Sequence, residues 1–140
     1  MKEELYHKAL LDLAKRARNQ ARLERPDLSA TVDNPLCGDR VTLDLRMNGG
    51  LVEQMGHKTR GCLLCEAAAA IITDQAPGHD AASLTKKASV IASLLEDESA
   101  DLGEIWPECR VFTPVRAYKS RHGCVTLPFQ ALIKALESAC

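Results

Sequence analysis

Three cysteines and one aspartate in this sequence could together hold a metal ion. Cys37 and Asp39 belong to the segment NPLCGD (34–39), Cys62 to GCLLC (61–65) and Cys124 to RHGC (121–124). Each cysteine stands where one expected element gives way to another, and residues in such loops can converge at one edge of a rigid scaffold. Three thiolates and a carboxylate would complete a tetrahedral zinc site. Because a carboxylate oxygen is a weaker partner than sulfur for a soft metal, we expect the site to be exchangeable.

The intervals between these cysteines leave two interpretations open. Cys37, Cys62 and Cys124 are separated by 25 and 62 positions, unlike the short paired spacings of zinc fingers. Free cysteine is also among the most buried residue types, so each thiol could simply fill a gap in the core. A glycine stands beside each cysteine, at positions 38, 61 and 123. Glycine permits tight turns and close approach of the backbone, which a core thiol does not need, so this pattern favours a shared site.

Cys65 introduces a second possible chemistry. With Cys62 it forms a C-x-x-C pair at the start of an expected helix, where the helix dipole would lower the pKa of a thiol. A dithiol oxidoreductase is therefore the alternative function, although the βαβ surroundings of a thioredoxin-like motif are absent. We favour a Cys65 side chain that packs inward. The remaining cysteines and three histidines are interpreted as packing or surface residues: Cys109, Cys140, His7, His57 and His79.

The composition restricts the class of protein. The 140 residues suit one domain spanning 1–140, and 46% hydrophobic with 26% charged residues is the balance of a soluble globule. A net charge of −1 and an aromatic content of 4% argue against nucleic acid as a partner. No apolar run approaches the roughly 20 residues of a membrane helix, and residues 1–13 lack the apolar core of a secretory signal. We expect a cytoplasmic protein that does not bind membranes, whose six cysteines are not a disulfide framework.

Periodicity predicts a helix and a hairpin in the first half of the chain. Residues 3–24 have the spacing of an amphipathic helix, which Pro26 is expected to end. Residues 41–47 alternate between apolar and polar side chains. Asn48-Gly49 is typical of a hairpin turn, and 51–58 would form the returning strand.

The second half is predicted to be mainly helical. Residues 62–75 are rich in alanine, a further helix should start between 80 and 83, and a last amphipathic helix should follow 126–128. The acidic segment 96–108 is expected to be a solvated loop or short helical turn, anchored by Trp106. With strands early and helices late, we expect an α+β fold, in which a small antiparallel sheet has helices packed on one face.

These motifs together resemble one known family. The segment Asn34-Pro-Leu-Cys-Gly-Asp39, the Gly61-Cys62 pair before a helix of small residues, and Arg121-x-x-Cys124-x-x-Leu127-Pro128 are similar to the IscU/NifU-type iron–sulfur cluster assembly proteins. The long interval between Cys62 and Cys124, with arginine three residues before the last cysteine, is most similar to the SufU-type branch. The acidic segment belongs to that extra length.

The resemblance implies a protein that receives persulfide sulfur from a cysteine desulfurase. It would then either assemble a [2Fe-2S] cluster or pass the sulfur onward, and recipient iron–sulfur apoproteins would be its further partners. By position, zinc or the cluster would be held by Cys37, Asp39, Cys62 and Cys124. The resemblance implies that Cys37 is the sulfur acceptor and that Arg121 contacts the partner. The chemistry is consistent, because zinc holds a bound thiol as thiolate and only the thiolate attacks a persulfide sulfur.

The chain also departs from the IscU pattern in two places. IscU scaffolds have histidine directly before the last cysteine, where this chain has Gly123, and we do not count His122 as a ligand. The Leu-Pro-Pro-Val-Lys stretch to which a chaperone binds in IscU is absent, so cluster transfer driven by a chaperone is not expected.

Overall fold

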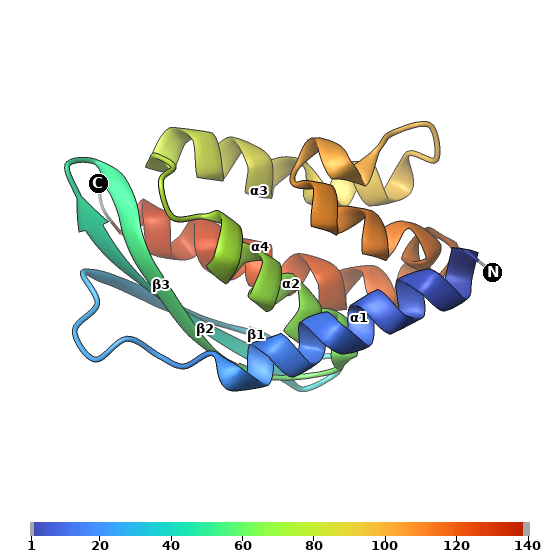
Figure 1. Ribbon diagram of the computed structural model, residues 1–140, viewed down its shortest axis with the longest axis horizontal. Coiled ribbons are helices and arrows are strands. Elements are labelled where there is room, and N and C mark those ends of the chain that lie inside the picture. Colours follow the sequence, from blue (N-terminus) through green and yellow to red (C-terminus); the bar gives the residue numbers. More distant parts are fainter. Residues whose placement is uncertain (1, 139–140) are drawn as a thin grey trace.

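The computed structural model describes residues 2–138 and has two layers, a small sheet and a group of helices on one of its faces (Figure 1). The sheet contains three antiparallel strands in the order β1-β2-β3. These strands are β1 (Leu28–Asn34), β2 (Asp39–Asn48) and β3 (Leu51–Arg60). The α-helices are α1 (Lys2–Asn19), α2 (Leu63–Gln75), α3 (Ala81–Glu96) and α4 (His122–Glu137). The α+β fold predicted from the sequence is confirmed.

The alternation of side chains along β2 determines which face of the sheet the helices cover. Three apolar side chains of this strand are completely buried: Val41, Leu43 and Leu45. They lie on the side where α2 and α4 pack against the sheet, and burying each one contributes about 1.5–3 kcal/mol. The hairpin predicted at Asn48-Gly49 is also confirmed, with Asn48 paired to Leu51. Gly49 and Gly50 have φ of 61° and 82°, the left-handed conformation that a two-residue hairpin turn requires.

The structure differs most from the sequence prediction over residues 20–34. The helix predicted for 3–24 ends at Asn19, and residues 28–34, for which no strand is predicted, form β1. Residues 20–27, here called the crossing segment, run across the sheet on the face away from the helices. The backbone N–H of His57 in β3 donates to the carbonyl of Ala21 (3.2 Å), and the N–H of Asp27 donates to Leu45 in β2 (2.8 Å). These bonds to the sheet replace those that would have continued the helix.

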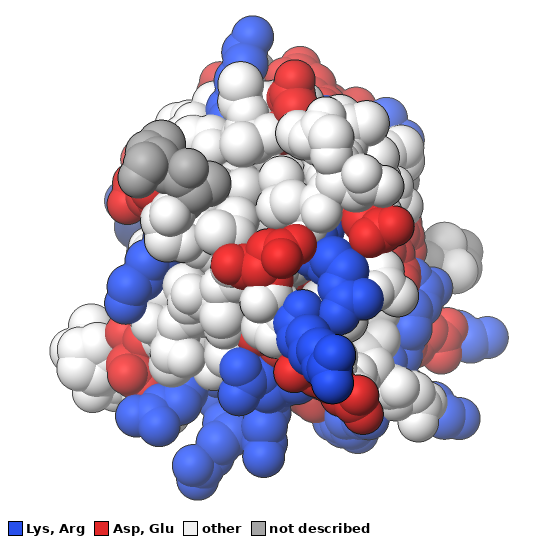
Figure 2. All heavy atoms as spheres, turned by 90° about the vertical axis from the view of Figure 1, so that its left-hand side faces the viewer, with Lys and Arg blue, Asp and Glu red and all other residues white. Residues whose placement is uncertain are grey.

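Two neighbouring residues of the sheet hold the crossing segment in place. Gly56 leaves room for it, because a Cβ there would collide with its backbone. Asp44 pairs with Gly56 and is fully buried. Its carboxylate accepts two hydrogen bonds from the guanidinium of Arg22 (both 3.0 Å) and one from the hydroxyl of Ser29 (2.7 Å). Figure 2 views the molecule from the left-hand side of Figure 1. Lys and Arg side chains gather on the lower part of that side, where Figure 1 places the sheet.

Helix α2 is the central helix, and its composition explains this position. The four alanines at 67–70 are fully buried, and such small side chains allow α1 and α4 to approach closely from either side. The helix begins directly after Cys62, as the sequence predicts. Helix α3 begins after Asp80, whose carboxylate accepts a hydrogen bond from the N–H of Ser83 (2.8 Å). This is the usual stabilising role of aspartate at a helix start.

The region between α3 and α4 contains three 3₁₀-helices. They are η1 (Leu102–Glu104), η2 (Pro107–Ala117) and η3 (Lys119–Arg121). Trp106 is only 5% exposed, so it anchors this region as predicted. The ammonium group of Lys87 in α3 lies 5.5 Å from its ring centre, within cation–π range.

The start of the last helix differs from its prediction. Helix α4 begins at His122 and not after 126–128, so Cys124 lies in its first turn. Pro128 therefore lies inside the helix. Because proline has no N–H, the carbonyl of Cys124 does not receive the bond that a residue four positions on would normally donate. Among the described helices, none is both long enough and apolar enough to cross a bilayer.

Candidate metal centre

Four elements meet at one end of the sheet and bring chemistry-bearing side chains together. Cys37 lies in the turn between β1 and β2, Asp39 is the first residue of β2, Cys62 immediately precedes α2, and Cys124 lies in the first turn of α4. The sulfur atoms of Cys37 and Cys124 and a carboxylate oxygen of Asp39 all lie within 4.8 Å of one another. Ligands of a tetrahedral zinc ion with Zn–S bonds of ~2.3 Å are about 3.8 Å apart. Small side-chain movements would therefore suffice to enclose a metal ion.

The turn that carries Cys37 is shaped by Asn34. Its side-chain oxygen accepts a hydrogen bond from the N–H of Leu36 (3.1 Å), and its carbonyl accepts one from the N–H of Gly38 (2.8 Å). Gly38 has φ of 74°, a left-handed conformation that other residues rarely adopt. The turn leaves the Cys37 side chain exposed. Sequence reasoning missed this role of Asn34, although asparagine before proline is a known signal for turn initiation.

The other two glycines allow close approach between elements. A Cβ on Gly61 would lie 2.9 Å from the carboxylate carbon of Asp39, and one on Gly123 would lie 3.1 Å from the side-chain nitrogen of Asn34. The backbone before α2 therefore approaches Asp39 closely, and the start of α4 approaches the turn that carries Cys37. The three glycines beside the cysteines serve the assembly of this site, as their pattern indicates.

Asp39 shows that the site suits a cation. The residue is 6% exposed, and its Oδ2 atom is buried without a hydrogen-bond partner among the described residues. Leaving a buried polar atom unpaired costs about 1–3 kcal/mol, and more for a charged group. A metal ion bound by this oxygen and the neighbouring sulfurs would remove that cost. The donor set of carboxylate and thiols fits zinc or iron.

Cys62 lies at the edge of this group. It is half-buried and is not among the three residues whose ligand atoms are mutually within 4.8 Å. Burial, a hydrogen bond with the Cys62 side chain and the negative charges of Cys62, Asp39 and Cys37 together raise the pKa of the Cys124 thiol to about 12. Without a metal the Cys124 thiol is protonated at neutral pH. A metal cation favours the thiolate and reverses this preference.

Cys65 packs behind the site, as predicted. Its side chain is completely buried. Burial raises the pKa of its thiol, and the negative charges of the site act in the same direction. The expectation that the helix dipole lowers a thiol pKa in this C-x-x-C pair is therefore wrong for Cys65, because loss of solvation outweighs the dipole.

Arg121 and His122 lie beside the site in different ways. Arg121 is exposed and lines a small apolar pocket of about 280 Å³ together with Leu64 and Tyr118. The Nε2 atom of His122 donates to the carbonyl of Val115 (3.1 Å), and its ring nitrogens are not among the candidate ligand atoms that lie within 4.8 Å of one another.

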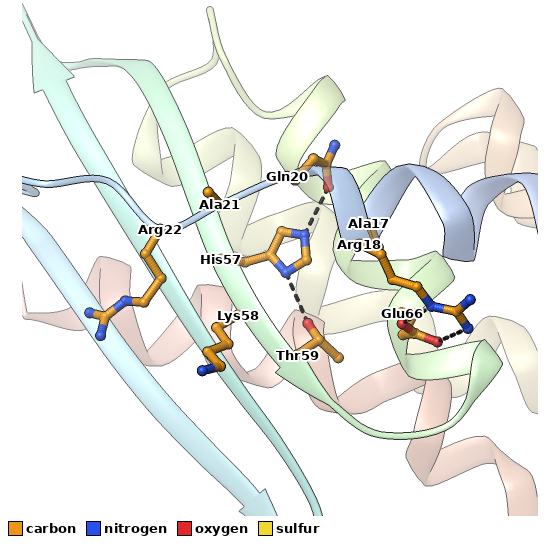
Figure 3. A pocket seen from close by; sticks show the side chains of 9 residues that line it. All are labelled: Ala17, Arg18, Gln20, Ala21, Arg22, His57, Lys58, Thr59 and Glu66. Carbon is orange, nitrogen blue, oxygen red and sulfur yellow. Dashed lines mark hydrogen bonds and ion pairs between the residues drawn. The ribbon is translucent and has the colours of Figure 1, made fainter.

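A polar pocket of about 360 Å³ lies between the end of α1, β3 and the start of α2 (Figure 3). At its base, the ring nitrogens of His57 are hydrogen bonded to the side-chain oxygens of Gln20 (2.8 Å) and Thr59 (2.9 Å). Burial lowers the pKa of His57. Arg18 donates two hydrogen bonds to Glu66 (both 2.9 Å) beside it. His57 is thus a packing residue, as predicted, that ties α1 to the strand leading to Cys62.

The chain is similar to known proteins over almost its whole length. The zinc-dependent sulfurtransferase SufU of Bacillus subtilis is 28% identical over 136 residues, which cover 94% of this chain and 89% of that protein. The iron–sulfur cluster assembly scaffold protein IscU of Thermotoga maritima is 23% identical over 133 residues, covering 95% and 93%. The crystal structure of a NifU-like protein (N-terminal) from Brucella abortus superposes with a TM-score of 0.85 at 29% identity, covering 98% of this chain and 95% of that one. Residues 5–125 match the family described as NifU-like N terminal domain, and the chain belongs to this family of iron–sulfur cluster assembly proteins.

Proposed function

We propose that this chain accepts persulfide sulfur from a cysteine desulfurase on Cys37 and passes it to an acceptor. Zinc would be held by four residues: Cys37, Asp39, Cys62 and Cys124. The observation that carries the proposal is the contrast in exposure within this group. Cys37 is exposed on a turn, whereas Asp39 and Cys124 are buried. A partner can therefore reach the Cys37 thiol directly, while Asp39 and Cys124 remain enclosed and Cys62 is half-buried.

The transfer step needs a thiolate on Cys37 and a donor persulfide. The Cys37 sulfur attacks the terminal sulfur of the persulfide, a new S–S bond forms, and the S–S bond of the donor breaks. The donor cysteine leaves as a thiolate, so no external oxidant or reductant is required. Zinc, when bound, supplies the positive charge that keeps the thiols of the site deprotonated at neutral pH. Residues 35–38 of this turn are all exposed, so a partner can approach the Cys37 thiol without displacing a buried element.

Assembly of a [2Fe-2S] cluster is the second candidate function. The relative from Thermotoga maritima is named a scaffold and matches 95% of this chain. The same three thiols and the unpaired oxygen of Asp39 could hold iron, with the cluster as cargo for recipient apoproteins. A carrier would stimulate the desulfurase without accumulating a cluster, whereas a scaffold would accumulate one.

Arg121 would contact the desulfurase from beside the site. It is exposed at the entrance to α4, next to an apolar pocket. The variant Arg121→Ala should weaken binding to the desulfurase and leave the zinc content unchanged. Lys119→Ala is the matched control, because Lys119 is an exposed cation on the same 3₁₀-helix. Equal losses in the two variants would show a nonspecific effect of charge.

Persulfide mapping tests the proposed function directly. The zinc-loaded chain is incubated with a cysteine desulfurase and cysteine, alkylated and digested. We expect the added sulfur on the peptide that contains Cys37, no transfer to Cys37→Ser, and normal transfer to Cys109→Ala, which removes a buried thiol outside the site. Sulfur found on Cys62 or Cys124 of the wild type, with Cys37 unmodified, would contradict the assignment.

A further inference from the structure

Cys65 is a buried thiol that the proposed sulfur transfer does not use. It lies in the first turn of α2 and is 0% exposed. A Cβ on Gly61 would lie 2.9 Å from the carboxylate carbon of Asp39 and 3.1 Å from the Cβ of Cys65. Cys65 and Asp39 therefore both lie against Gly61, which places Cys65 directly behind the candidate metal site.

The backbone holds Cys62 and Cys65 in positions that a disulfide can join. Cys62 caps α2 with an extended backbone (φ −75°, ψ 173°), and its side chain makes no capping hydrogen bond. The N–H of Glu66 donates to the carbonyl of Cys62 (3.0 Å), so the intervening turn is regular helix. Cα atoms three residues apart on a helical turn are about 5 Å from each other. Disulfides span Cα separations of about 4.4–6.8 Å, so the backbone of this turn places the two cysteines within disulfide range.

We propose that Cys62 and Cys65 form a reversible disulfide when the site holds no metal and the protein meets a peroxide. The Cys62 sulfur attacks one peroxide oxygen, an S–O bond forms, the O–O bond breaks, and water leaves, giving a sulfenic acid. The Cys65 sulfur then attacks the Cys62 sulfur, an S–S bond forms and the S–O bond breaks. Hydroxide leaves and takes up the thiol proton as a second water. The two sulfurs lose two electrons, which reduce one peroxide molecule to two waters.

The different burial of the two thiols explains why Cys62 reacts with the peroxide and Cys65 reacts with the oxidised Cys62. Cys62 is half-buried, so a small oxidant can reach it once no metal holds it. Cys65 is completely buried, so an oxidant in solution meets Cys62 first. Capture by a neighbouring thiol stops oxidation at a level that thiols can reverse, whereas a sulfinic acid is not restored by them. The disulfide also withdraws Cys62 from metal binding until it is reduced, a consequence that rests on the proposed ligand set.

Peptide mapping can identify this bond without ambiguity. Trypsin cleavage after Arg60 and Lys86 releases both cysteines on the single peptide 61–86, while Cys124 lies on peptide 122–134. Metal-free protein is treated with a stoichiometric amount of hydrogen peroxide, denatured and alkylated before digestion. We expect peptide 61–86 to be unalkylated and lighter by two hydrogen atoms, and to be alkylated twice after reduction. A crosslink between 61–86 and 122–134, or an alkylated Cys65, would overturn the proposal. Zinc-loaded protein should be protected.

The variant Cys65→Ala tests the role of the buried thiol. After peroxide treatment and reduction, wild type should regain its zinc binding, whereas Cys65→Ala should recover several-fold less because Cys62 is oxidised further. Cys109→Ala is the matched control for loss of a buried thiol and should behave as wild type. Equal recovery in Cys65→Ala and wild type would refute the protective role. The assay contains no desulfurase, so it succeeds or fails independently of the proposed sulfur transfer.

Discussion

Replacing Gly61 by alanine should damage the candidate metal site without changing any of its four proposed ligands. The new Cβ would lie 2.9 Å from the carboxylate carbon of Asp39 and 3.1 Å from the Cβ of Cys65. Ordinary contacts between such atoms are about 3.5–4.0 Å. Cys65 is enclosed in the core and has little room to move. The Asp39 carboxylate must therefore shift away from the position that its partners in the site require.

The expected magnitude follows from the size of this clash. Inserting a methyl group into a packed region typically costs about 1–3 kcal/mol, so the free energy of unfolding of the metal-free protein should fall by about that amount. Changes in the groups that orient a metal ligand typically lower affinity about 10–100-fold. We expect the zinc Kd of Gly61→Ala to rise within that range, because one of the four proposed ligands is displaced and none is lost.

Competition with a chromogenic chelator measures the zinc Kd, and urea unfolding of the metal-free protein measures the stability. Gly123→Ala is the matched control. Its Cβ would lie 3.1 Å from the side-chain nitrogen of Asn34, an atom at the end of a flexible side chain that can shift. A smaller effect on zinc affinity is expected there. Wild-type affinity in Gly61→Ala, or an equal loss in Gly123→Ala, would refute the reasoning.

Three further predictions concern the elements that support the site. Asp44→Asn should lower the free energy of unfolding by about 1–3 kcal/mol at neutral pH, because the buried charge-assisted bonds to Arg22 are lost. Burial alone would raise the pKa of Asp44, but hydrogen bonds from Arg22 and its neighbours outweigh it and lower the pKa below 3.8. The stability that the Asp44 carboxylate contributes is present above that pH and is lost as the pH falls below it. Acid unfolding monitored by circular dichroism should therefore depend less on pH in Asp44→Asn than in wild type. An unchanged profile would contradict this role of Asp44. Burial holds the pKa of His57 below 6.5, so the unfolded chain binds more protons than the native protein and stability falls as the pH drops below 6.5. Urea midpoints measured at neutral pH and at about pH 5 should differ less in His57→Gln than in wild type, and an equal difference would argue against this. Asn34→Ala removes the acceptor for the N–H of Leu36, and loss of about 1 kcal/mol of turn stabilisation should raise the zinc Kd about fivefold; a Kd unchanged by the substitution would show that the turn is held by other contacts.

The residues of the candidate site could be predicted because their chemistry is local. Cysteine and aspartate are common metal ligands, and the adjacent glycines indicate tight turns or close approach, which Gly38 and Gly61 show in the structure. That Cys37, Asp39 and Cys124 converge could not be derived from their spacing. It depends on the pairing of β1 with β2 and on the packing of α4 against both strands.

Elements whose conformation depends on distant partners were harder to predict. Residues 20–27 look like the end of an amphipathic helix, but bonds from their backbone to His57, Asp44 and Leu45 hold them against the sheet in a non-helical conformation. Gly56, which makes room for them, lies far along the chain. The early start of α4 was obscured by Pro128, which would suit a first turn and instead lies in the interior of the helix.

Metal content per chain tests the central claim most directly. Wild type and the variants Cys37→Ser, Cys62→Ser, Cys124→Ser and Asp39→Ala are purified anaerobically, and zinc and iron are measured together with folding by circular dichroism. The account predicts nearly one metal ion per wild-type chain and a marked loss in every variant, each of which remains folded. A wild type that binds no metal, or variants that keep their metal, would contradict a shared site at these four residues.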